Sequence, residues 1–259
     1  MHRAWPAVVI AVAIATSAAT AYADCRAHSA ARTTALIELY TSEGCDSCPP
    51  ADRWLSSLST QTLGERAVAL ALHVDYWDRL GWKDRFGSAG FSQRQRDESV
   101  RSGGDFVYTP QVLLQGRDFA SWHAAGGVEK AIAAINARPA RAVLDLAAHP
   151  VEAAVDVDVR ARVTNARDRA NAVFAIALVQ SGLESDVKAG ENAGKRLRHD
   201  HVVRQWRPVI ALDESGGGAA KVTLKLPADP GPLSLVVLAE NARTGDVLQV
   251  LEMPLCAAH

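Results

Sequence analysis

The sequence lacks a strong charge of either sign. Its 28 Lys and Arg residues are balanced by 29 Asp and Glu residues, which leaves a formal net charge of -1. Proteins that bind nucleic acid carry clustered basic residues, and this composition offers no such footprint. The sequence also lacks a nucleophile elbow, a phosphate-binding glycine loop and internal repeats. We therefore expect no nucleic-acid partner, and no signature supports a hydrolase.

Long hydrophobic runs are scarce as well, and the longest one lies at the N-terminus. Residues 7–19 are apolar apart from two hydroxyl side chains, follow a basic start at residues 1–3, and precede an Ala-x-Ala pattern at residues 21–23. The run is shorter than the ~20 residues that a membrane-spanning helix needs, and no later stretch approaches that length. These features are typical of a secretory signal peptide over residues 1–23. We expect an exported chain, periplasmic or secreted, that has no membrane contact after cleavage.

Cysteine is also scarce, with four residues in the chain. Cys45 and Cys48 form one Cys-x-x-Cys pair, and the absence of a second pair argues against a zinc knuckle. Cys25 and Cys256 lie near the two ends of the mature chain, and the ends of a domain are often close together. Because export favours disulfides, we expect a structural bridge between these outer cysteines, worth at most about 5 kcal/mol by the chain-entropy model.

The segment 36–50 combines a short apolar strand, the Cys-x-x-Cys pair and two prolines where a helix should begin, which places the second cysteine just ahead of that helix. Cysteines three residues apart across a turn can form and reopen a disulfide without large backbone motion. A helix N-terminus stabilises a nearby thiolate through its positive dipole end and unpaired N–H groups. The pattern predicts a thiol–disulfide site with Cys45 as the attacking thiolate and Cys48 as the resolving cysteine, without a cofactor.

Two other interpretations of this cysteine pair stay open. The pair could be a permanently oxidised structural disulfide, or Cys45, Cys48 and His73 could hold Cu(I) in a metal carrier, because soft thiolates suit that ion. A Met-rich or His-rich loading tract would favour the carrier, but the chain has 2 Met residues in total. Oxidoreductase chemistry is therefore the leading hypothesis, with protein thiols or disulfides as substrates and a redox partner protein.

Periodicity predicts the order β-α-β-α-β-β-α for the first half of the chain. The first strand opens the segment 36–50, and the remaining elements are expected at residues 51–63, 67–74, 92–101, 111–115, 119–122 and 128–137. Residues 138–140, Arg-Pro-Ala, then mark a boundary, because the residue before a proline disfavours helix. We expect one domain over residues 24–138 and a second one over residues 141–259.

The second half changes to the two-residue period of strands, and the alternating apolar and charged residues over 155–163 are typical of a half-buried strand. Six further strands are expected at residues 142–147, 173–179, 201–212, 222–226, 233–240 and 246–252. About seven strands separated by turns predict an all-β, sandwich-like C-terminal domain. We expect this half to act as a partner-binding or stabilising module.

The first half resembles the thioredoxin fold, in which a Cys-x-x-Cys pair follows the first strand and a cis-proline precedes the third. Thr109-Pro110 stands at that place, so the resemblance implies a cis Pro110 that faces the cysteines as part of the catalytic site. Longer motifs resemble the secreted thioredoxin-like family catalogued as domain of unknown function 1223 (DUF1223). They are residues 38–52, 73–78, 81–84, 107–111, 190–195 and 199–204. This resemblance implies an α/β thioredoxin-like N-terminal domain with a redox site, in a family whose substrate and reaction are unsettled.

Histidine and carboxylate side chains near the end of the second strand are further candidates. His73 and Asp75 could shuttle protons during thiol exchange, whereas His73 could equally be a histidine that is hydrogen-bonded beneath the loop. His199 and His201 would share one face of a strand and could both ligate a metal ion. Two ligands are too few for a site, so we predict no metal site and keep His73, His199 and His201 as weak candidates.

Acidic residues surround the predicted attacking cysteine, with Glu43 two positions before Cys45 and Asp46 directly after it. A like charge several Å away costs a thiolate on the order of 1 kcal/mol, which is similar to what a helix N-terminus contributes. The two effects roughly cancel. Because a thiolate with little stabilisation gives a more negative reduction potential, we predict a reductant-like or isomerase-like protein rather than a strong oxidase.

Overall fold

The computed structural model describes residues 25–58, 66–209, 212–213, 215–229 and 231–256. The predicted signal peptide lies outside these residues, and so does the end of the first expected helix. The described residues form fourteen strands and three α-helices. The strands are β1 (Cys25–His28), β2 (Ala35–Thr41), β3 (Ala67–His73), β4 (Gln111–Leu114), β5 (Arg117–Asp118), β6 (Ala142–Val151), β7 (Ala154–Val163), β8 (Ala172–Gln180), β9 (Leu183–Asp186), β10 (Arg196–His199), β11 (Val202–Val209), β12 (Gly217–Lys225), β13 (Leu233–Asn241) and β14 (Val247–Pro254). The helices are α1 (Pro49–Ser57), α3 (Ala89–Arg101) and α4 (Gly127–Asn136).

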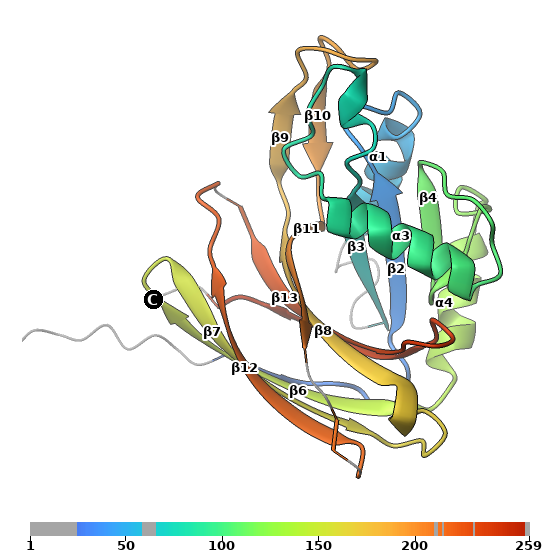
Figure 1. Ribbon diagram of the computed structural model, residues 1–259, viewed down its shortest axis with the longest axis vertical. Coiled ribbons are helices and arrows are strands. Elements are labelled where there is room, and N and C mark those ends of the chain that lie inside the picture. Colours follow the sequence, from blue (N-terminus) through green and yellow to red (C-terminus); the bar gives the residue numbers. More distant parts are fainter. Residues whose placement is uncertain (1–24, 59–65, 210–211, 214, 230, 257–259) are drawn as a thin grey trace, which may run out of the picture.

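An eight-stranded mixed sheet runs through the molecule in the order β14-β13-β8-β11-β3-β2-β4-β5 (Figure 1). β2 and β3 are parallel, and every residue in them is buried because both faces of this part of the sheet are covered. β11 continues the sheet beyond β3 through the parallel pairing of Val202 with Ala71. Ala71 N also donates to His201 O at 2.8 Å. Strands from both halves of the chain therefore share one sheet.

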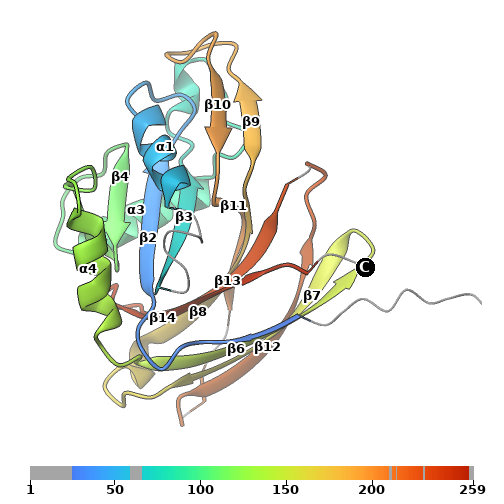
Figure 2. The ribbon, with the colours of Figure 1, turned by 180° about the vertical axis from the view of Figure 1, so that it is seen from behind.

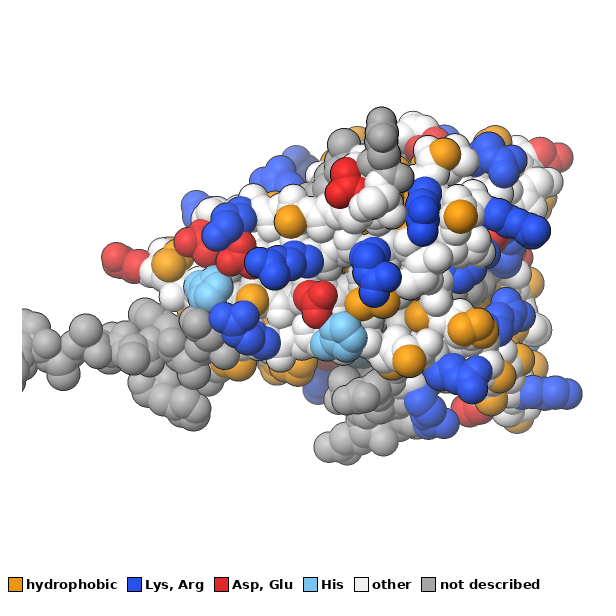
Figure 3. Space-filling view, turned by 90° about the horizontal axis from the view of Figure 1, so that it is seen from below, with side chains coloured by type: hydrophobic (Ala, Val, Ile, Leu, Met, Phe, Trp, Pro, Cys, Tyr) orange, Lys and Arg blue, Asp and Glu red, His pale blue; other side chains and the backbone are white. Residues whose placement is uncertain are grey.

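A four-stranded antiparallel sheet, β1-β6-β7-β12, packs against the β8-β13-β14 end of the large sheet (Figure 2). Val157 of β7 and Ile176 of β8 belong to the apolar core between these two layers. The outer face of the smaller sheet carries basic, acidic and histidine side chains (Figure 3). Asp158 on this face pairs with Lys221 (3.1 Å) and His149 (3.4 Å). This end of the molecule is a β-sandwich with a solvated outer face.

Helices cover both faces of the other end of the large sheet (Figures 1 and 2). α1 and α4 pack against one face of β2, β3 and β4, where Leu55 and Ile132 enter the apolar core. α3 covers the opposite face and brings in Arg94, which pairs with Glu38 of β2 (2.9 Å) and Glu240 of β13 (2.8 Å). This buried ion-pair network links strands from the two halves of the chain.

The predicted fold class, an α/β thioredoxin-like N-terminal domain followed by an all-β sandwich-like domain, is wrong. The molecule is mostly β and sandwich-like, and the first-half strands do not close a sheet of their own. The physical reason is the free edge of β3, whose unpaired backbone groups bond to β11 from the second half. The domain boundary at residues 138–141 stays a prediction, and strands from both sides of it enter the large sheet.

Most expected elements lie near their predicted residues, and the alternating segment 155–163 falls within β7, with its valines buried. The strand expected at residues 119–122 is wrong. The chain turns earlier, at Gly116 with a φ of 74°, and returns as the short β5. β1, β9 and β10 were not predicted, because each has four residues and charged side chains, too few positions for a period to be recognised.

A disulfide joins Cys25 of β1 to Cys256 after β14; their Cα atoms are 6.0 Å apart, and the two residues are 231 positions apart in the sequence. The expected bridge between the outer cysteines is therefore present. Together with the inner disulfide, it is consistent with a protein that resides in an oxidising compartment. None of the helices in the described part of the chain has the length and apolar character that crossing a membrane requires.

Candidate functional site

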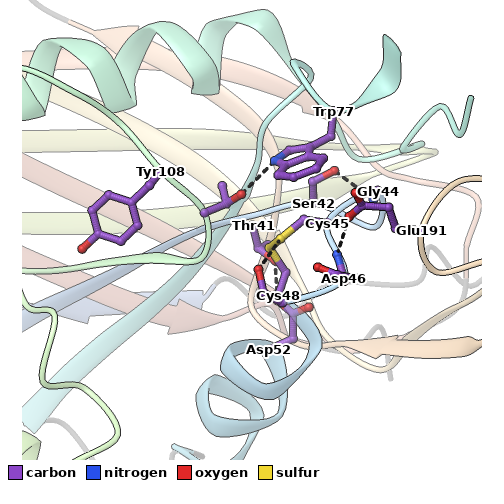
Figure 4. Close-up of a disulfide and its surroundings, with 12 residues drawn as sticks. Thr41, Ser42, Gly44, Cys45, Asp46, Cys48, Asp52, Trp77, Tyr108 and Glu191 are labelled. Atoms are coloured by element: carbon purple, nitrogen blue, oxygen red, sulfur yellow. Dashed lines mark hydrogen bonds between the residues drawn. A yellow bond between two sulfur atoms is a disulfide. The ribbon is translucent and has the colours of Figure 1, made fainter. Parts of the chain in front are cut away.

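The Cys-x-x-Cys pair lies in the loop between β2 and α1, where Cys45 and Cys48 form a disulfide with their Cα atoms 5.4 Å apart (Figure 4). The loop is a series of tight turns. Cys45 N donates to Ser42 O (3.2 Å), and Cys48 N donates to Cys45 O (3.3 Å). β2 is buried along its whole length, so the loop starts from a fixed strand end.

α1 begins directly after the second cysteine. Cys48 is the N-cap, and Pro49 and Pro50 occupy the first helical positions, where a proline forfeits no helical hydrogen bond. Ala51 N and Asp52 N donate to the carbonyl of Cys48 at 2.9 and 3.1 Å. The expectation that Cys48 sits just ahead of the helix is confirmed, and the positive end of the helix dipole lies at the disulfide.

Both cysteines are fully buried, and Trp77 packs against their loop. A side chain at Gly44 would approach the Cβ of Trp77 to 3.0 Å, which favours glycine there. Trp77 Nε1 donates to Thr109 Oγ1 (2.8 Å), and Thr109 precedes Pro110 in a cis peptide bond, as predicted. Trp77 and Asp52 lie on opposite sides of the disulfide in Figure 4.

One side chain between the cysteines contacts a sulfur atom. Ser47 Oγ lies 3.4 Å from Sγ of Cys45, and this serine is exposed. A hydroxyl that donates to a thiolate favours the charged form of the cysteine. Tyr108, in contrast, points away from the disulfide in Figure 4, and its hydroxyl donates to Asp118 Oδ1 (2.8 Å). The Cys45 sulfur therefore has a polar neighbour to which the sequence assigned no role.

The turn between β9 and β10 holds the cysteine loop from the second half of the chain. Figures 1 and 2 show this hairpin beside α1. Asn192 in the turn is fully buried. Its Nδ2 donates to the carbonyls of Glu43 (2.8 Å) and Cys45 (2.9 Å). Lys195 Nζ in turn donates to Asn192 Oδ1 (2.8 Å).

Charged and aromatic side chains form a buried cluster beneath the cysteine loop. His73, at the end of β3, donates through Nδ1 to Oδ2 of Asp84 (2.7 Å). His199, the last residue of β10, lies with Nε2 3.3 Å from Oε1 of Glu43. The two imidazole rings are 4.9 Å apart, and Phe86 packs edge-on against both. His73 is thus the histidine hydrogen-bonded beneath the loop that the sequence allowed.

Burial and charge pairing shift the pKa values in this cluster. Burial acts to lower the pKa of His73, but Asp84 outweighs it and raises that pKa above its ordinary value. Burial acts to raise the pKa of Asp84, yet His73 and two backbone N–H groups bring it down to about 2. Burial raises the pKa of Asp52, an effect that His199 and His73 oppose in part. His73 and Asp84 therefore each favour the charged form of the other.

Other predicted site residues are held elsewhere. Asp75 accepts the hydroxyl of Ser92 in α3 (2.5 Å). His201 lies in the bend between β10 and β11 with a φ of 59°, so it does not continue a strand face with His199. Across the described ranges, no three His, Cys, Asp or Glu side chains are grouped so that they could hold a metal ion. The roles of His73 and Asp75 as proton shuttles stay predictions.

Sequence reasoning assigned no role to Ser47 or Asn192, although both lie in motifs that carried the family resemblance. Asn192 and Cys45 are 147 positions apart, and no period or spacing connects a turn with a loop over that distance. The pairing of His199 with Glu43 depends on the same tertiary contact. For Ser47 and Asn192, the available signal was a family motif in which they had no predicted role.

Comparisons with known proteins give the family and the fold. A family model described as protein of unknown function (DUF1223) matches residues 36–239. No curated protein sequence matches this one. A crystal structure of a protein from Agrobacterium tumefaciens is 25% identical with a TM-score of 0.57, covering 86% of this chain and 94% of that one. HBP35 of Porphyromonas gingivalis is 13% identical with a TM-score of 0.64, covering 88% of this chain and 76% of that one, and this likeness shows the fold alone.

Proposed function

We propose that this chain, which belongs to the DUF1223 family, is an exported thiol–disulfide oxidoreductase. The observation that carries the proposal is the disulfide between Cys45 and Cys48 at the start of α1. Two cysteines that close across a turn at a helix N-terminus suit reversible exchange, because the helix stabilises the thiolate that attacks and leaves.

The exchange needs two steps. In the reduced protein, the Cys45 thiolate attacks one sulfur of a substrate disulfide, which forms a mixed disulfide and releases the first substrate thiolate. The Cys48 thiolate then attacks the Cys45 sulfur, which closes the Cys45–Cys48 disulfide and releases the second substrate thiolate. Two electrons and the two cysteine protons pass to the substrate thiols. A dithiol partner protein reverses the sequence and restores the reduced pair.

The charges around Cys45 favour a reduction potential like that of a reductant or an isomerase. Asp46 is exposed beside it, and the carboxylate of Glu191 accepts the Asp46 N–H (3.1 Å). Burial acts to raise the pKa of Glu43, but contacts led by the one with His199 hold that pKa below its ordinary value, so Glu43 is ionised. These negative charges oppose the helix dipole at the Cys45 thiolate, which makes the reduced form less stable.

Burial of both sulfurs favours protein substrates. An incoming thiolate reaches the disulfide only after the covering groups move, and Trp77, which donates a hydrogen bond to Thr109, is one of the side chains that pack on the loop. A partner protein that binds over this loop supplies contact energy for that movement, whereas a small thiol supplies very little. We therefore propose protein thiols or disulfides as substrates and a protein as the redox partner.

Redox titration of the purified protein tests the proposal. The protein is equilibrated with a glutathione series, free thiols are alkylated, and the peptides that carry the inner and outer cysteines are quantified separately. We expect Cys45 and Cys48 to become reduced together at one midpoint. If they stay oxidised across the series, the pair is a static structural disulfide and the proposal fails.

Single cysteine variants test the assigned roles. Cys45→Ser should abolish exchange, while Cys48→Ser should accumulate mixed disulfides that it cannot resolve. Gel shifts under non-reducing conditions report the trapped species, and wild-type protein is the reference. Equal trapping by both variants contradicts the assignment of Cys45 as the attacking residue.

The copper-carrier alternative gains no support from the arrangement of side chains. His73 uses Nδ1 to bond Asp84, and it is not part of any potential metal-binding group of three within the part of the chain that the structure describes. A parallel titration of the reduced protein with Cu(I) separates the two functions, because a carrier would protect both inner thiols from alkylation at one equivalent of the ion.

A further inference from the structure

The β9–β10 turn bonds to a carbonyl that is central to the Cys-x-x-Cys turn. Cys45 O accepts the N–H of Cys48 at 3.3 Å, which closes the turn between the two cysteines. The same oxygen accepts Nδ2 of Asn192 at 2.9 Å, and the second hydrogen of that amide goes to Glu43 O at 2.8 Å. One side chain therefore fixes the peptide groups on both sides of Gly44 and Cys45.

A further hydrogen bond, from Lys195, determines the orientation of the Asn192 side-chain amide. Lys195 Nζ donates to Oδ1 of Asn192 at 2.8 Å, so the oxygen faces the ammonium group and the nitrogen faces the two carbonyls. The turn that carries it is tight, since Lys195 N donates to Asn192 O (3.0 Å) and Gly190 has a φ of 72°. A Cβ at Gly190 would lie 3.2 Å from that of Trp82, so the turn packs closely on the Trp82 loop. Asn192 is thus a rigid donor of two hydrogen bonds.

We propose that Asn192 is a positioning residue that shifts the equilibrium of the inner cysteines toward the disulfide, an inference that rests on the proposed function in that the pair must be reducible. Closing a disulfide requires Cys45 and Cys48 to hold one turn conformation, and an unconstrained loop loses conformational entropy when it closes. A loop that is already held by Asn192 loses less. The effective concentration of one thiol at the other is higher as a result.

The reaction that reports this equilibrium is balanced with glutathione. Two glutathione molecules reduce the Cys45–Cys48 disulfide, supply two electrons and two protons, and leave as one oxidised glutathione. The equilibrium constant of this reaction depends on how closely the loop in the dithiol form already has the conformation that the Cys45–Cys48 disulfide requires. Loss of the Asn192 donors loosens the turn and moves the equilibrium toward the dithiol.

Asn192→Leu is the sharpest test, because the side chain has about the size of the amide, adds no charge to the cysteine loop and donates to neither carbonyl. We expect its equilibrium constant with glutathione to move toward the dithiol by a factor of about ten or more, where tenfold is 29.6 mV for a two-electron couple. The readout is alkylation of the inner cysteines after full equilibration, measured by mass spectrometry.

Asn136→Leu is a matched control. Asn136 Nδ2 also donates to two backbone carbonyls, those of Thr33 (2.7 Å) and Arg66 (2.8 Å), but outside the cysteine loop. Both variants should unfold more easily than wild type, and Asn136→Leu should leave the glutathione equilibrium within about twofold. If Asn192→Leu does not fold, Asn192→Ser replaces it, and its shorter side chain should give a shift in the same direction.

The outcomes separate this inference from the proposed function. If wild-type protein cannot be reduced at any glutathione ratio, the proposed function fails, and this inference fails with it because there is no equilibrium to set. If wild type titrates normally but the Asn192 variants match Asn136→Leu, the function stands and the positioning role is overturned. A shift of the Asn192 variants toward the disulfide also overturns it.

Discussion

The Nδ1 atom of His73 lies 2.7 Å from Oδ2 of Asp84, and neither side chain has any exposed surface. Asp84 also accepts the backbone N–H groups of Glu43 and Phe86 at 2.9 Å each. Removing one partner of a buried ion pair leaves the other charge unpaired and costs about 3–5 kcal/mol. We expect Asp84→Asn to lower the free energy of unfolding by about that amount at pH 6, measured by urea denaturation.

The chain offers a matched control for this pair. His28 Nδ1 and Asp145 Oδ1 are 2.6 Å apart, but their side chains are 64% and 55% exposed. Exposed ion pairs contribute less than about 1 kcal/mol, so Asp145→Asn should have a small effect. Similar losses in the two variants would contradict the stabilising role assigned to the buried pair.

The pH dependence of the buried pair has two limits. The pKa of Asp84 is about 2 in the folded chain and about 3.9 in the unfolded chain. The contribution of Asp84 to the free energy of unfolding is therefore complete above about pH 4 and is lost as the pH falls toward 2. The pKa of His73 is raised above about 6.5 by Asp84 against the effect of burial. Its contribution is therefore complete below about pH 6.5 and is lost as the pH rises through the folded-state pKa. The difference between wild type and Asp84→Asn should be largest between about pH 4 and 6.5.

Local patterns predicted most of the elements but not how they assemble. The buried run over residues 67–74 and the alternation over 155–163 identify β3 and β7, because burial on two faces or one face leaves a mark on neighbouring residues. The pairing of Val202 with Ala71 leaves no such mark. That single pairing joins the halves into one sheet, and it is the reason why the predicted fold class was wrong.

The candidate site likewise contains residues that sequence motifs identify and residues that they do not. Cys45, Cys48 and Pro110 stand in motifs that a reader of the sequence can recognise, and the structure brings the two cysteines together as a disulfide. Asp84 and Asn192 act through contacts that cross loops, so no spacing rule identifies them. Charge partners and hydrogen-bond donors from distant segments set the chemistry of such a site, and these are what a single sequence conceals.

Glu98 of α3 gives a second pH-dependent prediction. Its Oε1 is 2.6 Å from Arg101 and 3.6 Å from Arg94. Burial raises its pKa to about 7 against the opposing effect of Arg94, and the carboxylates of Glu38 and Glu240 add to the increase. Because the folded chain holds this proton more tightly than the unfolded chain, stability falls as the pH rises from about 4.5 to about 7.

Glu98→Gln should remove that decrease. Between pH 5 and 8, the free energy of unfolding of the wild type should fall by up to about 3 kcal/mol. The amide of the variant stays neutral, so the variant should not show this fall. Urea denaturation at several pH values measures it, and Glu129→Gln, at an exposed glutamate of α4, is the control. Wild-type and Glu98→Gln curves that run parallel across this range would refute the prediction.

The outer disulfide should stabilise the fold more than the inner one. Cys25 and Cys256 are 231 positions apart, whereas Cys45 and Cys48 are 3 apart. In the chain-entropy model the contribution grows with the length of the closed loop and reaches at most about 5 kcal/mol here. Guanidinium unfolding of the two double Cys→Ser variants compares them, after a non-reduced digest has established both pairings. A larger loss on removal of the inner pair contradicts this order.

The reduction potential of the inner pair is the most direct measure of its role. The N-terminus of α1 stabilises a Cys45 thiolate, and Ser47 Oγ adds a donor 3.4 Å from its sulfur. Asp46 and the carboxylate of Glu191, which is bound to the Asp46 N–H, place negative charge on the same loop. Because the stabilising and destabilising effects have similar magnitudes, the Cys45 thiolate gains little net stabilisation. The reduction potential should therefore be that of a reductant or isomerase.

Asp46→His reverses the sign of the charge next to Cys45 when the imidazole is protonated. The thiolate becomes more stable, so the midpoint pH for alkylation of Cys45 should fall and the potential should become less negative, because stabilising the thiolate stabilises the reduced form. Ser47→Ala removes a donor and should move both quantities the other way. Glu129→His, on α4, controls for a charge change elsewhere on the surface. A wild-type potential already near about -120 mV, the value of the strongest periplasmic oxidant, would refute this poise, because the acidic groups would then have no measurable effect on the thiolate.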